Sequence, residues 1–110
     1  MKGSIAVKEE YLDIMKIFGD IQDQANFAFR HFIIDRICEK IDTCQKSIQE
    51  YESKYQMKYS EFQEKVSMNE EFVKKLNRTH PTWENDLIIW EAHNTELERW
   101  KNYLNSILTT

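Results

Sequence analysis

The sequence has few of the residues that turn or cross-link a chain. Its 110 residues include two glycines, one proline and two cysteines. Since glycine and proline supply most tight turns, we expect few turns and a mainly helical protein. Cys38 and Cys44 are six residues apart in one predicted helix and point to different faces. A disulfide or a metal pair between them is therefore not expected, and both are interpreted as small buried hydrophobes, with Cys44 on the apolar seam described below.

Other absences exclude whole classes of function. No apolar run approaches a membrane span and no signal-peptide pattern opens the chain, so we expect a cytoplasmic protein without a membrane partner. The net charge of −4 is spread evenly, which is untypical of a nucleic-acid domain. The histidines are scattered, and the pair His31 and Asp35 is more typical of a surface contact than of a metal site. We expect no catalytic residues, no metal, no cofactor and no enzyme activity.

The first third of the chain switches from a period of two to a helical period. Residues 4–8 alternate, with Ile5 and Val7 on one face, which predicts a short strand. Because a single strand leaves its backbone groups unpaired, we expect it to pair with the same strand of a second copy in a two-chain ribbon. Residues 9–18 then have the spacing of a short amphipathic helix. Gly19 is predicted to end that helix, and Asp20 to cap the next one.

A long helix is predicted from Ile21 to Tyr55, and its apolar face changes midway. The second part carries a heptad seam, which is typical of helix-on-helix packing: Ile34, Ile37, Ile41, Cys44, Ile48, Tyr51 and Tyr55. The first part, up to Phe32, has a similar spacing in another phase, so it faces a different partner. We therefore divide the chain into residues 1–36, a dimerisation and DNA-binding unit, and residues 37–110, a helical partner-binding region.

The rest of the chain is predicted to form a helical hairpin with the long helix. Residues 54–60 look like a connection, and Ser60 with Gln63 has the spacing of a capping box. Asn69 is placed to cap a helix over residues 70–77, which ends before Pro81. Thr82 is then a plausible cap for a last helix over residues 83–108.

Two stripes run along this last helix. Trp83 and Trp90 are seven residues apart, and Trp100 lies to one side of their face. The acidic residues Glu84, Glu91 and Glu98 are also seven apart. A solvated face is the default interpretation of the acidic stripe, and a surface for a basic partner is the sharper one. The tryptophans suit either an interface or the core of the hairpin.

Residues 5–32 resemble a ribbon-helix-helix domain. In that family the outward strand positions face DNA bases, so the resemblance assigns DNA contacts to Lys2, Ser4, Ala6 and Lys8. It also implies that the turn at residues 19–23 grips phosphate. The resemblance therefore implies an otherwise all-α fold with one short N-terminal strand in an intermolecular ribbon, and a homodimer on operator DNA.

The C-terminal part, with residues 51–57, Phe62, residues 83–86, Trp90 and Glu91, is similar to small prokaryotic antitoxin-like helical proteins. This likeness implies a small basic toxin-like partner, held by Trp83, Glu84, Trp90, Glu91, Glu98 and Trp100. We therefore expect an antitoxin-like transcriptional regulator. The alternative is a non-enzymatic helical interaction or assembly protein that dimerises through the N-terminal strand without binding DNA.

Overall fold

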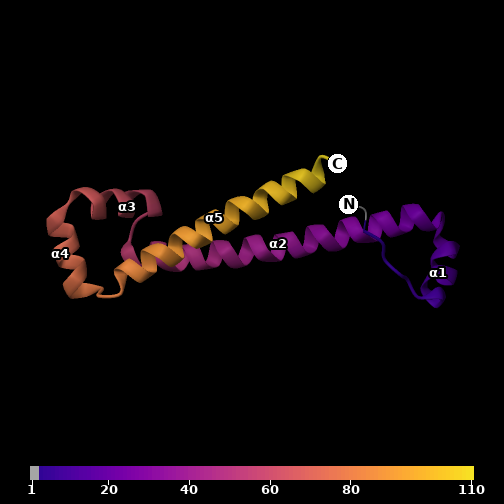
Figure 1. The fold of residues 1–110 in the computed structure, drawn as a ribbon, viewed down its shortest axis with the longest axis horizontal. Coiled ribbons are helices and arrows are strands. Elements are labelled where there is room, and N and C mark those ends of the chain that lie inside the picture. Colours follow the sequence, from indigo (N-terminus) through magenta and orange to yellow (C-terminus); the bar gives the residue numbers. More distant parts are fainter. Residues whose placement is uncertain (1–2) are drawn as a thin grey trace. The chain divides into compact units, whose positions relative to one another are not determined.

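The computed structural model describes residues 3–110, which form five α helices, one short 3-10 helix and no β strand. The elements are α1 (Glu9–Met15), η1 (Lys16–Phe18), α2 (Ile21–Tyr55), α3 (Tyr59–Met68), α4 (Glu70–Thr79) and α5 (Trp83–Leu108), drawn in Figure 1. The chain divides into two compact units, residues 1–36 and residues 37–110, and α2 contributes to both. None of the described helices is both long enough and apolar enough to span a bilayer.

The predicted N-terminal strand is wrong, and with it the intermolecular ribbon. Residues 4–8 have no regular secondary structure and their side chains are exposed. Every regular element in residues 3–110 is helical, so its backbone groups are paired internally and no edge is offered to a strand. The backbone of Lys8 is extended, and its carbonyl accepts hydrogen bonds from the N–H groups of Tyr11 and Leu12. The alternation therefore marks an extended lead into α1.

The predicted junction between the first two helices is confirmed. Gly19 separates η1 from α2 with a φ of 134°, a conformation that is strained for any residue with a side chain. Asp20 then caps α2, because its Oδ1 accepts a hydrogen bond from the N–H of Asp23 at 3.1 Å. These local interactions connect consecutive helices within residues 3–36. No side chain in residues 3–36 is buried.

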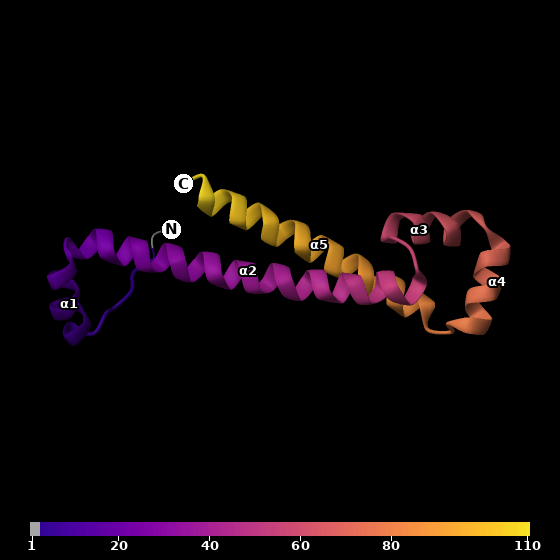
Figure 2. The ribbon, with the colours of Figure 1, turned by 180° about the vertical axis from the view of Figure 1, so that it is seen from behind.

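In the second unit, α5 runs back along the second half of α2, and α3 and α4 lie at the closed end of this hairpin (Figures 1 and 2). Gln56, with a φ of 56°, follows the last residue of α2. Asn69 caps α4 as predicted, since its Oδ1 accepts from the N–H of Phe72 at 3.1 Å. The capping box at Ser60 is not formed, because α3 already begins at Tyr59. Thr82 precedes α5 without a side-chain capping bond.

An aromatic cluster forms the core where the hairpin closes. Trp90 and Phe62 are fully buried, and their ring centroids lie 5.5 Å apart. The rings of Tyr51 and Tyr59 lie 5.7 Å and 5.5 Å from that of Trp90. Aromatic pairs at such separations contribute about 0.5–1.5 kcal/mol each beyond the burial of their area. The cluster therefore joins α2, α3 and α5 around one indole.

The predicted heptad seam of α2 is confirmed by burial. Ile37, Cys44 and Tyr55 are buried, and the members between them are half-buried. Cys38 is exposed, which agrees with the prediction that the two cysteines point apart, but its interpretation as a buried hydrophobe is wrong because it lies off the seam. The seam places Cys44 and Tyr55 on the side of α2 that faces α5.

Phe62 provides a direct test of this core. Phe62→Ala removes a ring with no solvent exposure and should lower the free energy of unfolding by about 3–5 kcal/mol. Met68→Ala, on the same helix but 80% exposed, should change it by less than about 0.5 kcal/mol. Urea denaturation followed by tryptophan fluorescence measures both. Equal losses in the two variants would show that the core is not where the structure places it.

Candidate functional site

Asp86 on α5 is the one buried charged residue among residues 3–110. Its Oδ2 accepts hydrogen bonds from the Lys54 ammonium at 2.6 Å and from the Tyr55 hydroxyl at 2.5 Å. Burial by itself would raise the pKa of this carboxyl. The hydrogen bonds from Lys54 and Tyr55 outweigh the effect of burial, so the pKa is lowered from its ordinary value. Asp86 is therefore ionised at neutral pH and fastens the first turn of α5 to the last turn of α2.

Tyr55 is the second member of this group. Burial raises the pKa of its hydroxyl, and the hydrogen bond to the Asp86 carboxylate raises it further, because an ionised tyrosine could not donate that bond. Tyr55 was predicted to lie on the apolar seam, but its hydrogen bond with Asp86 was not predicted. Asp86 lies three residues after Trp83 and four before Trp90, and this spacing puts all three on one helix face. The spacing indicates that Asp86 faces the core, but it does not identify Tyr55 as its partner.

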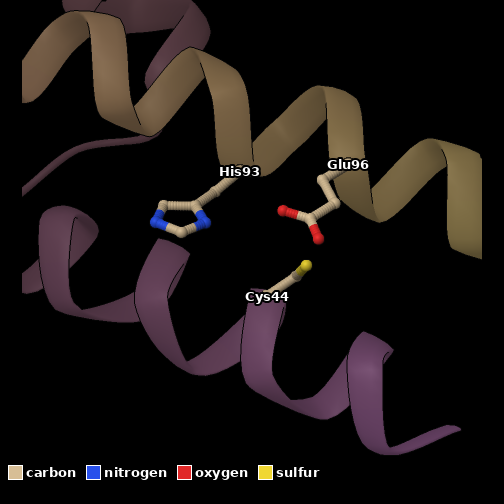
Figure 3. A group of neighbouring side chains, drawn as sticks. All are labelled: Cys44, His93 and Glu96. Atoms are coloured by element: carbon tan, nitrogen blue, oxygen red, sulfur yellow. The ribbon is translucent and has the colours of Figure 1, made fainter. Parts of the chain in front are cut away.

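Three metal-ligating side chains meet further along the same hairpin (Figure 3). Cys44 comes from α2, and His93 and Glu96 come from α5, where a spacing of three residues places both on one face. One donor atom from each lies within 4.8 Å of the others. Cys44 is buried, whereas His93 and Glu96 are half-buried. Burial raises the pKa of the Cys44 thiol, and the nearby Glu96 carboxylate raises it further.

The proximity of Cys44, His93 and Glu96 was not predicted from the sequence, from which we expected no metal site. Cys44 was recognised as a buried seam residue, and its burial is confirmed. The missing step was to pair that seam with the face of the last helix that carries His93 and Glu96. Such a pairing requires the register between the two helices, which the spacing of residues within each helix does not give.

The N-terminal unit carries a different kind of feature, an exposed apolar surface. Ten large apolar side chains between residues 3 and 36 are exposed: Ile5, Val7, Tyr11, Ile14, Ile17, Phe18, Phe27, Phe29, Phe32 and Ile33. Phe29, Phe32 and Ile33 are at i, i+3 and i+4 on α2 and so share one face of the helix. Phe27 pairs locally with the ring of His31, with the two ring centroids 4.3 Å apart.

The predicted partner-binding residues fall into two groups. Trp83 and Trp90 are buried in the core, and the indole N–H of Trp83 donates to Asn77 on α4 at 2.8 Å. Glu84, Glu91 and Glu98 are exposed along α5. Trp100 is half-buried, and its N–H donates to Glu96 at 3.2 Å. The structure therefore separates the two tryptophans of the core from the acidic stripe and from Trp100.

The predicted DNA-binding residues have no ribbon to present them. Ser4, Ala6 and Lys8 are exposed on the irregular segment that precedes α1. Lys2 lies outside the described residues. The resemblance placed these side chains on one face of a strand, so their proposed common surface is lost with the strand.

Compared with protein-family models, with curated proteins and with solved structures, the chain has no significant match. The resemblances noted in the sequence therefore stay hypotheses.

The buried tyrosine predicts a specific loss of stability in alkali. Above about pH 10 an unfolded tyrosine ionises, whereas folded Tyr55 keeps its proton because its pKa is raised. The free energy of unfolding should therefore fall as the pH rises above about 10, because the unfolded state then binds fewer protons than the folded state. Urea denaturation at a series of pH values should show a shallower fall in Tyr55→Phe than in the wild type.

Some alkaline slope should persist in Tyr55→Phe, because burial also raises the pKa of Tyr51 and Tyr59. Tyr11→Phe is the control, since Tyr11 is exposed and outside this core. If the free energy of unfolding falls as steeply with pH in Tyr55→Phe as in Tyr11→Phe, the raised pKa of Tyr55 is contradicted.

Proposed function

We propose that this protein is a non-enzymatic helical interaction protein that self-associates through its N-terminal unit. The single observation that carries the proposal is the distribution of burial. Among the described residues, the eight that are buried all belong to residues 37–110, whereas residues 3–36 have ten exposed large apolar side chains and no buried one. The C-terminal unit has a core of its own, and the N-terminal unit needs a partner to provide one.

The balance between the cost of ordering the backbone and the gain from apolar burial supports the need for a partner. Ordering the backbone costs about 1–2 kcal/mol per residue, and the main compensation in folded proteins is the burial of apolar surface. Fully burying a side chain such as Phe or Ile contributes about 1.5–3 kcal/mol. Residues 3–36 obtain little of this compensation within one chain. A partner that covers several of the exposed rings would supply it, which is typical of small units completed by association.

A second copy of the same chain fits this surface best. Residues 1–36 carry nearly equal numbers of basic and acidic side chains, so the unit does not select a partner of strong opposite charge. The stripe of Phe29, Phe32 and Ile33 is apolar and helical, and two such stripes can cover each other around a twofold axis. Association through helix faces replaces the strand ribbon that the sequence suggested.

The antitoxin-like regulator stays a prediction with less support. Its DNA-reading part depended on the ribbon, which residues 3–110 do not form. Its partner-binding part keeps the exposed stripe of Glu84, Glu91 and Glu98, a surface that would speed the association of a basic protein. No further observation favours that partner.

The proposal predicts a dimer that one substitution disrupts. Phe32→Glu places a charge in the apolar stripe of Phe29, Phe32 and Ile33. It should weaken self-association by at least about tenfold, since burying an unpaired charge is strongly unfavourable. Ile88→Glu is the matched control, because Ile88 is equally exposed, at 67% against 64%, but lies on α5. Sedimentation equilibrium over a range of concentrations measures both constants.

A wild-type protein that is monomeric at high concentration would overturn the proposal. So would equal weakening by the two variants, because the interface would then include the C-terminal unit. The fluorescence-detected unfolding of Phe32→Glu should match that of the wild type at low concentration, since the tryptophans all lie in residues 37–110.

A further inference from the structure

We propose that Cys44, His93 and Glu96 form a binding site for a divalent transition-metal ion, with zinc as the best match. The three side chains offer one sulfur, one imidazole nitrogen and one carboxylate oxygen from two facing helices (Figure 3). This site lies entirely within residues 37–110 and is independent of the proposed self-association.

The mixture of donors selects the class of ion. Thiolate and imidazole favour borderline ions such as Zn²⁺ and Co²⁺, whereas Mg²⁺ and Ca²⁺ are held almost entirely by oxygen. Three protein ligands with a fourth position left for water form a recognised tetrahedral arrangement for zinc. The donor set therefore points to zinc rather than to an alkaline-earth ion.

The separation of the donors is compatible with that coordination. Ligands bound to one tetrahedral zinc at about 2.0–2.3 Å lie roughly 3.5 Å from each other. The three donors are within 4.8 Å of one another before any ion is bound, so closing the site takes movements of about 1 Å. Glu96 is half-buried and has a long side chain, which allows such a movement without displacing the helices.

The charges of the site also balance. When a divalent ion binds, the Cys44 thiol loses its proton to solvent, and the thiolate and the Glu96 carboxylate together neutralise the ion. His93 contributes a neutral imidazole. Because Cys44 is only 3% exposed, a thiolate without an ion would be poorly solvated there, while a neutral metal centre is not penalised in this way.

A further contact orients one of the ligands. The indole N–H of Trp100 donates to the Glu96 Oε1 at 3.2 Å, and Trp100 is one helical turn beyond Glu96 on α5. Carboxylate ligands of metal sites are commonly held by such outer hydrogen bonds. We therefore assign Trp100 a positioning role toward Glu96.

Cobalt titration tests the site, because Co²⁺ takes the place of zinc and gives visible absorption. Reduced, metal-free full-length protein titrated with Co²⁺ should develop a thiolate-to-cobalt charge-transfer band and saturate at one ion per chain. Zinc added afterwards should bleach the spectrum. Zinc alone should raise the melting temperature of the wild type, since an ion that binds only the folded state stabilises it.

Variants of the ligands make the test specific. Cys44→Ser should abolish the charge-transfer band, and His93→Gln and Glu96→Gln should each weaken cobalt binding by at least about tenfold. The last two replace half-buried side chains, so they remain informative should Cys44→Ser fail to fold. Cys38→Ser and His31→Gln are matched controls, because both replace exposed side chains on α2. These two variants should bind cobalt as the wild type does.

Trp100→Phe should weaken binding by about 10–100-fold while keeping the charge-transfer band, because Cys44 remains a ligand. The proposal is overturned if the wild type gives no charge-transfer band and no thermal shift with zinc. It is equally overturned if the band persists in folded Cys44→Ser, or if His93→Gln and Glu96→Gln bind cobalt as tightly as the controls.

Discussion

The burial of the Trp90 indole between α2 and α3 is the constraint on which the C-terminal unit depends. Its ring packs against those of Tyr51 and Tyr55 on α2 and of Tyr59 and Phe62 on α3. These contacts fix where α5 starts its return along α2, and they also place α3 over the closed end. The indole N–H has no hydrogen-bond partner among the described residues, which is unfavourable for a buried donor. Aromatic packing at this position outweighs that penalty.

The same anchor sets the antiparallel register of α2 and α5, and the register determines which polar groups meet. One turn before Trp90 on α5, Asp86 lies opposite Tyr55 and Lys54. Beyond Trp90, His93 and Glu96 lie opposite Cys44. A shift of one helical turn would separate both groups, so the buried carboxylate and the three metal-ligating side chains depend on the same packing.

Much of this arrangement could be predicted from periodicity. The heptad seam from Ile34 to Tyr55, the stop at Gly19 and the caps at Asp20 and Asn69 are all local patterns, and the structure contains them. The strand at residues 4–8 failed because a pattern of five alternating residues also fits an extended lead into a helix. The pairings of Asp86 with Tyr55 and of Cys44 with Glu96 could not be predicted, because they depend on the register between two helices far apart in sequence.

We propose that residues 37–110 fold around their own core, whereas residues 3–36 are completed by a second copy of the chain. Hydrogen exchange measured by mass spectrometry at several protein concentrations tests this most directly, because protection reports local stability along the chain. We expect the amides of α3 and of α5 near Trp90 to be protected equally at all concentrations. Those of α1 and the first four turns of α2 should become protected only as the protein associates. Strong protection of these N-terminal helices in a dilute monomer, unchanged as the concentration rises, would contradict the proposed completion by a second copy.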